Sequence, residues 1–424
     1  MENTYKEIEE LVRRHYVLLG QQRPDRIDRV SLSAPAFDAR EALRAIRTIL
    51  DGWISQGPNV REFERDFSKY VGCSKGVAVN SGSSANLLAL LALKQVHGLK
   101  DGDEVIVPAA TFATVAMPIV QVGLVPVYVD VCRDTLNIDP DQAAAAISKK
   151  TRVLMPVHTL GYPADMPRLM KVATEHRLLV LEDCCEAHGS TIHGKKVGSY
   201  GDIAAFSFFV AHNMTTGEGG MIVTEQETLE VACRSLREFG RCDQRNVASS
   251  RFYSDDVLVD FDRRYVFDHI GYNLRMTDIA AAFGIEQLAK LEEMNRRRRA
   301  NAALLKELLR EVAGPLLELS PEQDGYVHTY YTFPIVLHEK LECTRREFAE
   351  HLESKGIETR PLFAGCLPDQ PGLRQAPGRV VGKLPNSRFL RDRLVFIGIH
   401  PALDERHMRY VAETVAGFLH GKGI

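Results

Sequence analysis

The sequence predicts an α/β protein: a mostly parallel central sheet with helices on both faces, plus a smaller C-terminal α/β domain. Short apolar runs of strand length alternate with helical patterns from residue 76 onward. These runs are almost continuously apolar, which is typical of parallel strands buried on both faces. The chain of 424 residues, 45% hydrophobic and 26% charged, is long enough for two domains.

Taken in order, the N-terminal half contains two leading helices and then the alternating pattern. We expect helices at 2–19 and 38–51, joined by a polar connector. The expected strands are 76–80, 104–107, 125–129, 152–157, 178–181, 203–208 and 221–224, with helices at 83–96, 114–122 and 165–176. This part predicts the parallel sheet.

The C-terminal half begins with a polar, irregular stretch at 241–268, of a length usually found in functional or mobile loops. A long helix at 277–312 is expected to lead into the second domain. Its expected elements are strands at 330–337 and 394–397 and helices at 344–355 and 404–418. We therefore divide the chain into an N-terminal helix and connector (1–30), a large domain (31–285) and a small domain (286–424).

Composition excludes several classes of function. The net charge of −3 shows no basic excess of the kind that binds nucleic acid, and we interpret the arginine run at 296–299 as a solvated helix face. The longest nearly apolar run, 203–211, falls short of the roughly 20 residues of a membrane helix. The acidic N-terminus is no signal peptide, and the eight cysteines lack disulfide-scaffold spacing. We expect a cytoplasmic protein.

The positions of two segments suggest that they bind a ligand. Asn-Ser-Gly-Ser-Ser-Ala-Asn at 80–86 lies between a strand and a helix, where unpaired N–H groups suit a phosphate. A plain helix cap by Ser83 or Ser84 explains it equally well. Asp183 ends a buried strand, where α/β folds bind ligands, although an aspartate there can also cap a helix.

The segment Phe-Ser-Phe-Phe-Val-Ala-His-Asn-Met-Thr-Thr-Gly-Glu-Gly-Gly at 206–220 resembles the cofactor-lysine segment of the DegT/StrS-type sugar aminotransferases. These are fold-type I enzymes that use pyridoxal phosphate, and their lysine forms a Schiff base with it. Here His212 stands in that place. Imidazole moves protons but forms no stable Schiff base. The resemblance implies the branch that uses free pyridoxamine phosphate to remove a hydroxyl from a keto-sugar.

The resemblance runs from about residue 31 to the C-terminus and implies further cofactor contacts. Ser83 and Ser84 match the phosphate-cradling turn, and Ser207 matches a phosphate-binding serine. Asp183 matches the aspartate that hydrogen-bonds the pyridine nitrogen. Glu186 falls where many members have glutamine beside the ring, a departure that leaves its contact open.

Two more residues match positions that contact the cofactor in this family. Phe112, in Pro-Ala-Ala-Thr-Phe at 108–112, matches the aromatic that stacks on the ring, with a core aromatic as the alternative. Asn273, in Gly-Tyr-Asn-Leu-Arg-Met at 271–276, matches an asparagine that reaches the phosphate of the neighbouring subunit. The implied protein is a homodimer with a composite active site.

The implied reaction is C3 dehydration of a 4-keto-6-deoxyhexose, in most members nucleotide-linked, with His212 as the base; imidazole suits this step because its ordinary pKa is near neutrality. One branch then releases ammonia; another takes electrons from a partner reductase through a [2Fe–2S] cluster with four cysteine ligands. Only Cys185 and Cys242 match cluster positions, and 246–276 holds no cysteine. We therefore expect no cluster, with these two and Cys184 as packing residues.

Three alternatives stay open. The first is a true aminotransferase, which needs a lysine; Lys195 and Lys196 are poor replacements because they fall in an expected surface hairpin. The second is a cofactor-binding regulatory subunit paired with an active homologue. The third is a dehydratase of a non-standard sugar from a natural-product pathway. His328, Arg360 and the 241–268 loop are candidate pocket residues, each with an equally good surface interpretation.

Overall fold

The structure is a computed structural model that describes residues 2–22, 26–34, 36–242 and 251–423. Its main sheet has eight strands in the order β1-β9-β8-β5-β4-β2-β3-β16. These are β1 (Lys75–Val79), β2 (Glu104–Pro108), β3 (Val125–Val129), β4 (Thr151–Leu154), β5 (Leu179–Asp183), β8 (Ile203–Ser207), β9 (Gly220–Thr224) and β16 (Arg379–Val380). Only β9 runs against the others, because both its neighbours pair with it antiparallel and every other pair is parallel. The predicted fold class is confirmed.

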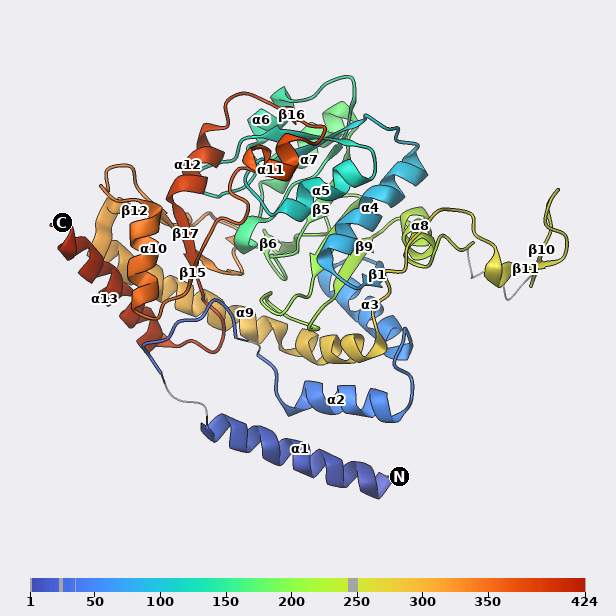
Figure 1. Cartoon of the computed structure of the whole chain (residues 1–424), viewed down its shortest axis with the longest axis horizontal. Helices are drawn as coiled ribbons and strands as arrows, with labels where there is room; N and C mark the ends of the chain where they lie inside the picture. The colour runs from blue at the N-terminus through green and yellow to red at the C-terminus, as the bar shows by residue number, and fades with distance from the viewer. Residues whose placement is uncertain (1, 23–25, 35, 243–250, 424) are drawn as a thin grey trace.

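Helices cover both faces of this sheet (Figure 1). One face packs on α4 (Gly82–His97), α5 (Ala113–Gln121) and α8 (Glu227–Arg237). The other packs on α3 (Pro58–Val71), α6 (Pro140–Ala145), α7 (Met166–His176) and α9 (Asp278–Ala313). Successive strand residues point to opposite faces, so Val77 and Val79 join the first core and Ala78 the second. Two apolar faces on one sheet explain why its strands are apolar throughout.

The small domain is built on an antiparallel sheet of order β12-β14-β17-β15. The strands are β12 (Leu317–Glu318), β14 (Phe333–Leu337), β15 (Thr359–Pro361) and β17 (Leu394–Ile397), with helices α10 (Arg345–Ser354), α11 (Pro371–Arg374), α12 (Pro385–Arg393) and α13 (Glu405–Gly421). The α9 helix runs through both units, and its C-terminal half packs under the small-domain core (Figure 1). A separate sheet joins the two units: β13 (Tyr326–Val327) of the small domain pairs with β6 (Thr191–Ile192) of the large one, and β6 also pairs with β7 (Lys195–Lys196).

The N-terminal helix α2 (Ala39–Leu50) lies along α9, and α1 (Glu2–Gln22) packs against α2 on the side away from α9 (Figure 1). Between them, Val30 is fully buried in the small-domain core and pairs with Ile357. The division at 1–30, 31–285 and 286–424 remains our proposal. Two observations cut across it: the second boundary falls inside α9, and β16 of the small domain pairs with β3 of the large one.

Within the stretch expected to be irregular, 241–268, the described residues 251–265 form an arm that projects from the body (Figure 1). Its described part contains the short hairpin of β10 (Phe252–Tyr253) and β11 (Phe261–Asp262); residues 243–250 lie outside the described residues. Large apolar side chains are exposed along it, among them Val257, Val259 and Phe261. Exposed apolar side chains of this kind are typical of a surface that meets another molecule.

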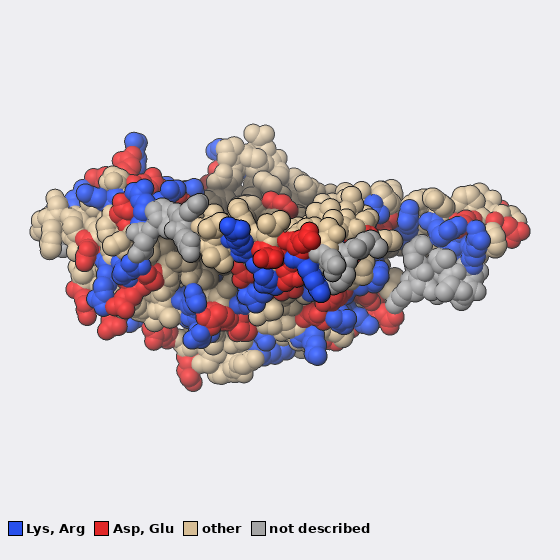
Figure 2. Space-filling model, turned by 90° about the horizontal axis from the view of Figure 1, so that it is seen from below, with Lys and Arg blue, Asp and Glu red and all other residues tan. Residues whose placement is uncertain are grey.

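Acidic and basic side chains are interspersed on the face seen from below (Figure 2). The arginine run is not the uniformly solvated face that we predicted. Arg296 and Arg297 are exposed and pair with Glu293, whereas the Arg298 side chain is only 3% exposed. Helical periodicity turns one residue of any run of four toward the interior. In the described part of the chain, no helix is long and apolar enough to cross a membrane.

Candidate active site

A cavity of about 290 Å³ opens at the carboxyl ends of the parallel strands. This is where open α/β sheets bind ligands. It is lined by Ser81, Gly82, Ser83, Thr111, Phe112, Thr114, Val115, Val157, Asp183, Cys185, Glu186, Ser207, Phe209, His212, Glu218, Tyr331 and Phe363. The structure thus brings together six of the eight predicted site residues and leaves Ser84 and Asn273 outside the lining.

Asp183 is the last residue of β5 and is 5% exposed. Its Oδ2 accepts a hydrogen bond from Asn86 Nδ2 at 2.8 Å, and its Oδ1 accepts one from the Cys185 main-chain N–H at 3.0 Å. Each oxygen keeps a lone pair for a ligand. Asn86 is a site residue that sequence reasoning missed; the signal was a polar residue inside a helix made mainly of leucine and alanine.

At the opposite end of the cavity, α4 begins beside Ser207. Ser81 caps the helix: its Oγ accepts from the Ser84 N–H, so neither Ser83 nor Ser84 is the cap. The Ser84 hydroxyl donates to Asn80 Oδ1 at 2.7 Å, whereas Ser83 lines the cavity. A Cβ on Gly82 would lie 2.4 Å from Ser207 Cβ. Only glycine lets the helix start approach Ser207 and present its unpaired N–H groups there.

His212 lies in the turn after β8, with its ring 5.0 Å from that of Tyr331 and 6.0 Å from that of His188. Its Nδ1 is buried and has no hydrogen-bond partner in the structure. Burial, and to a smaller extent the positive charge of Arg298, lower the pKa of His212 to about 3. The pKa of His212 thus lies below the ordinary value of imidazole, because a buried site penalises the charged imidazolium.

Aromatic rings from both domains form one wall of the cavity. Phe112 stands at the start of α5 with 48% of its surface exposed, and its ring meets Phe363 edge to face at 5.7 Å. Phe363 in turn stacks with Tyr331 at 6.4 Å. A core position for Phe112 is excluded by that exposure. Tyr331 and Phe363 had no sequence signal as site residues, since both come from the small domain.

The Glu186 carboxylate is nearly buried in the cavity wall. Its Oε2 accepts from the Leu160 N–H at 2.6 Å. Burial raises the pKa of Glu186 to about 8, and the nearby charge of Asp183 adds to this rise. His328, a candidate pocket residue, contacts the other side of Leu160: its Nε2 donates to the Leu160 carbonyl at 2.9 Å. His328 therefore shapes the loop that holds Glu186 and does not line the cavity itself.

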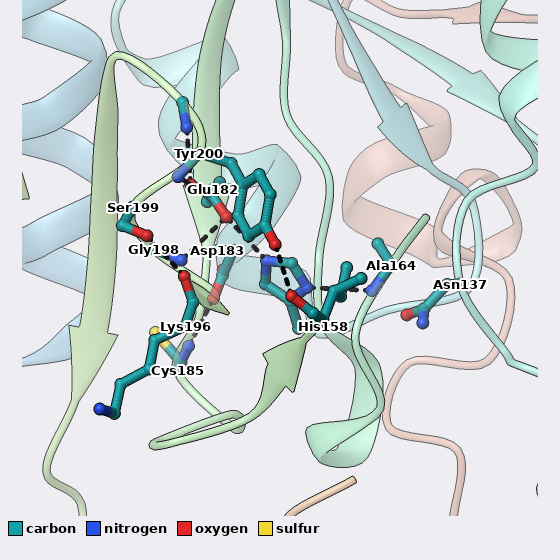
Figure 3. Close-up of polar contacts among 12 residues, drawn as sticks. Asn137, His158, Ala164, Glu182, Asp183, Cys185, Lys196, Gly198, Ser199 and Tyr200 are labelled. Carbon is teal, nitrogen blue, oxygen red and sulfur yellow. Dashed lines mark hydrogen bonds and ion pairs between the residues drawn. The ribbon is translucent and has the colours of Figure 1, made fainter. Parts of the chain in front are cut away.

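Behind Asp183, Glu182 anchors the same strand end (Figure 3). Its carboxylate accepts from the N–H groups of Gly198, Tyr200 and Gly201 and lies 3.2 Å from His158 Nε2. His158 Nδ1 accepts from the Ala164 N–H, so Nε2 carries the proton and donates to Glu182.

The ligand atoms of His158, Glu182 and Cys184 converge, but they do not fit a metal ion. Both histidine nitrogens are engaged in hydrogen bonds, so neither offers a lone pair. All eight cysteines lie in the described residues, none of them forms a disulfide there, and this is the one such converging group found there. It contains a single cysteine, whereas a [2Fe–2S] cluster needs four ligands. Cys185, contrary to a simple packing role, lines the cavity.

Several other candidates lie outside the cavity. The ammonium groups of Lys195 and Lys196 rest over the rings of Tyr200 and Tyr70. Arg360 is exposed on β15 and donates to the Thr359 carbonyl. Among the described residues that line the cavity there is no lysine. Asn273 is exposed and pairs with Glu238, away from its own chain's cavity.

Comparisons with known proteins agree with this geometry. The model of the DegT/DnrJ/EryC1/StrS aminotransferase family matches residues 36–416. The chain is 37% identical over 399 residues to dTDP-4-dehydro-2,6-dideoxy-D-glucose 3-dehydratase of Saccharopolyspora spinosa, covering 91% of this chain and 86% of that protein. It is 36% identical over 338 residues to GDP-perosamine synthase of Caulobacter vibrioides, covering 80% and 85%. Among solved structures, E. coli GDP-4-keto-6-deoxy-D-mannose-3-dehydratase with bound hydrated PLP matches with a TM-score of 0.83 at 30% identity, covering 91% of this chain and 98% of that one.

Proposed function

The chain belongs to the DegT/DnrJ/EryC1/StrS aminotransferase family, and from this premise we propose that it is a pyridoxamine phosphate-dependent dehydratase. Its substrate is a nucleotide-linked 4-keto-6-deoxyhexose, from which it removes the C3 hydroxyl. The observation that carries the proposal is His212 in a cavity without a lysine among its described lining residues. A transaminase of this fold needs a lysine to hold its cofactor covalently.

The residues of the cavity fit this cofactor. Gly82, Ser83 and Ser207 line the cavity at the start of α4, where unpaired helix N–H groups and two hydroxyls suit a phosphate. Asp183 offers a carboxylate with free lone pairs for a protonated ring nitrogen, and Phe112 offers an exposed ring face. When bound, the cofactor supplies an amino group that condenses with a carbonyl and a ring that accepts electron density.

His212 acts as the base in this proposal. Its lowered pKa keeps the ring neutral at pH 7, so a nitrogen lone pair is available to accept a proton from the cofactor's aminomethyl carbon. Because the site is buried, the imidazolium that forms readily gives the proton up again. The departing C3 hydroxyl leaves as water once it has received a proton. Asp183 would hold the ring nitrogen in its protonated form, in which the ring accepts electron density most readily.

We further propose that the enzyme works without an iron–sulfur cluster and ends in release of ammonia and a 3-deoxy-diketo sugar. The scattered placement of the cysteines supports this route. Pyridoxamine phosphate must then be regenerated by an amino donor such as glutamate. A partner reductase is not needed for this sequence of steps.

The active unit in this proposal is a homodimer. Asn273 does not line the cavity of its own chain, and the arm leaves apolar side chains uncovered. Both features are explained if the arm packs on a second copy and Asn273 of the partner subunit completes the phosphate site. Sedimentation of wild-type protein checks the dimer directly. Asn273→Ala is expected to weaken cofactor binding while the protein remains a dimer.

The proposal is tested with purified protein, pyridoxamine phosphate and a panel of GDP-, CDP- and dTDP-4-keto-6-deoxyhexoses. We expect loss of the C3 hydroxyl by mass spectrometry and stoichiometric ammonia. An amino-sugar product formed with glutamate would instead establish the aminotransferase, the activity class suggested by the 36% identity to a perosamine synthase. Iron bound in stoichiometric amount would replace the ammonia-releasing route with the reductase-coupled one.

A further inference from the structure

Asn86 is a buried amide whose position the helix sequence does not explain. It is 1% exposed, inside α4, where the surrounding side chains are mainly leucine and alanine. Asparagine is a weak helix former in such a position, and a buried amide is costly unless it is hydrogen-bonded. It lies four residues after Gly82, so both residues are on the helix face that looks toward the cavity.

One side chain here joins three parts of the site. Asn86 Nδ2 donates to Asp183 Oδ2 at 2.8 Å and to the Thr114 carbonyl at 3.3 Å. Asp183 ends β5, while Thr114 belongs to the first turn of α5, two residues after Phe112. The amide orientation is fixed by these contacts, because a flipped amide would set its oxygen against two acceptors.

The Asp183 carboxylate has few other partners. In the described part of the chain, its hydrogen-bond donors are the Asn86 amide, the Cys185 main-chain N–H and the Cys185 thiol, and no lysine, arginine or histidine donates to it. Neutral donors therefore carry the stabilisation of this buried carboxylate until a cationic ligand arrives. A hydrogen bond to a charged acceptor is the stronger kind, so loss of the Asn86 amide is significant.

We propose that Asn86 is a positioning residue for the cofactor: it fixes the orientation of the Asp183 carboxylate, with a lone pair left for the ring nitrogen, and it ties this carboxylate to the first turn of α5 beside Phe112. This inference rests on the proposed role of Asp183. Its consequence is that Asn86 controls how strongly the bound ring attracts electrons, although it touches neither cofactor nor substrate.

The test uses Asn86→Leu, with Asn86→Ser as a smaller replacement that cannot reach Asp183. Pyridoxamine phosphate labelled with ¹⁵N in the ring is bound to each protein, and the nitrogen chemical shift is followed with pH. We expect the apparent pKa of the bound ring nitrogen to fall by about one unit and cofactor affinity to fall about tenfold. With substrate, kcat is expected to fall more than KM rises.

The chain offers a matched control. Asn59 Nδ2 donates to Asp278 Oδ2 at the same 2.8 Å, away from the cavity. Asn59→Leu removes an equivalent amide–carboxylate bond and is expected to lower stability without changing the ring nitrogen. If the Asn86 variants match Asn59→Leu in ring protonation and cofactor affinity, Asn86 is merely structural and the proposal is overturned.

The variant Asp183→Asn separates the role of Asp183 from that of Asn86. Asp183→Asn is expected to lower the ring-nitrogen pKa more than either Asn86 variant. If Asp183→Asn changes nothing, the role of Asp183 fails and this inference fails with it. If Asp183→Asn acts as expected but the Asn86 variants do not, only the inference about Asn86 fails. Dehydration of a keto-sugar by wild-type protein reports the proposed function independently of both results.

Discussion

The two sides of the cavity are held in different ways. On the strand side, Asp183 accepts hydrogen bonds from Asn86 and from main chain, and Glu182 behind it accepts four more. On the facing side, His212 is surrounded by rings and its Nδ1 has no partner. The strand side thus fixes a charge in place, whereas the aromatic side leaves one nitrogen free to gain or lose a proton.

This difference follows from the task of each side. A permanent carboxylate needs donors to offset its burial. A proton-transfer base needs a nitrogen lone pair that can reach the proton it accepts. Desolvation then determines which state is present, and here it favours neutral imidazole. The predictions below test whether the two sides are separable in this way.

The largest effect is expected for His212→Asn. It should lower kcat by about 10²–10⁴-fold, the usual contribution of a general base, while cofactor affinity stays within a few-fold. Product formation and cofactor titration measure the two quantities. His193→Asn, on the exposed turn between β6 and β7, serves as the control. A matching loss of cofactor affinity in His212→Asn would show that the aromatic side also anchors the ligand.

Glu186→Gln tests the strand side of the cavity through the pH dependence of stability. The pKa of Glu186 is raised from 4.5 to about 8, so the folded protein keeps a proton that the unfolded chain releases above pH 4.5. Stability therefore falls as pH rises from 4.5 to about 8, by up to about 1.4 kcal/mol per pH unit. Glutamine removes this slope, so the variant should gain in relative stability at alkaline pH. Urea denaturation at pH 5 and pH 8 measures it; equal slopes would contradict a buried neutral carboxyl.

Arg298→Met tests whether Arg298 holds the main chain of the aromatic side in place. Arg298 Nη1 donates to the main-chain carbonyls of Tyr330 and Tyr331, at 3.2 and 2.9 Å. Leaving these acceptors without a donor is expected to cost about 1–3 kcal/mol of unfolding free energy. Because Tyr331 contacts His212, kcat should fall as well. Arg297→Met, on the exposed face of the same helix, should stay within about 0.5 kcal/mol. Similar values for both variants would remove Arg298 from the support of this side.

The smallest effect is expected for Ser84→Ala. Its hydroxyl serves the helix cap through Asn80 and Ser81, so its loss should cost about 1 kcal/mol or less and leave cofactor affinity nearly unchanged. Ser83→Ala, one residue earlier in the cavity wall, should weaken cofactor binding more than it affects stability. Chemical denaturation and cofactor titration of both variants give the comparison. A reversed order would place the phosphate at Ser84.

The sequence could predict the large domain well because both signals it relies on are local. Continuous apolar runs located seven strands of the main sheet, and capping and periodicity located α4, α7 and α9 within a few residues. Five α-helices of the described chain were not predicted: α3, α6, α8, α11 and α12. In α3, α8 and α12 many charged residues dilute the apolar stripe, whereas α6 and α11 span six and four residues, too few to show a helical period. β16 was also missed, since two residues carry no periodicity and pair across a domain boundary.

The sequence by itself determined the chemistry of the site: histidine in place of lysine, an aspartate after a buried strand and serines at a helix start are all side-chain identities. Only the tertiary structure decided their burial, their neighbours and their protonation state. Burial lowers the pKa of His212, Tyr331 and Phe363 arrive from the other domain, and Arg298 turns inward from a run of four. Desolvation and contact depend on segments distant along the chain, so no local pattern encodes them.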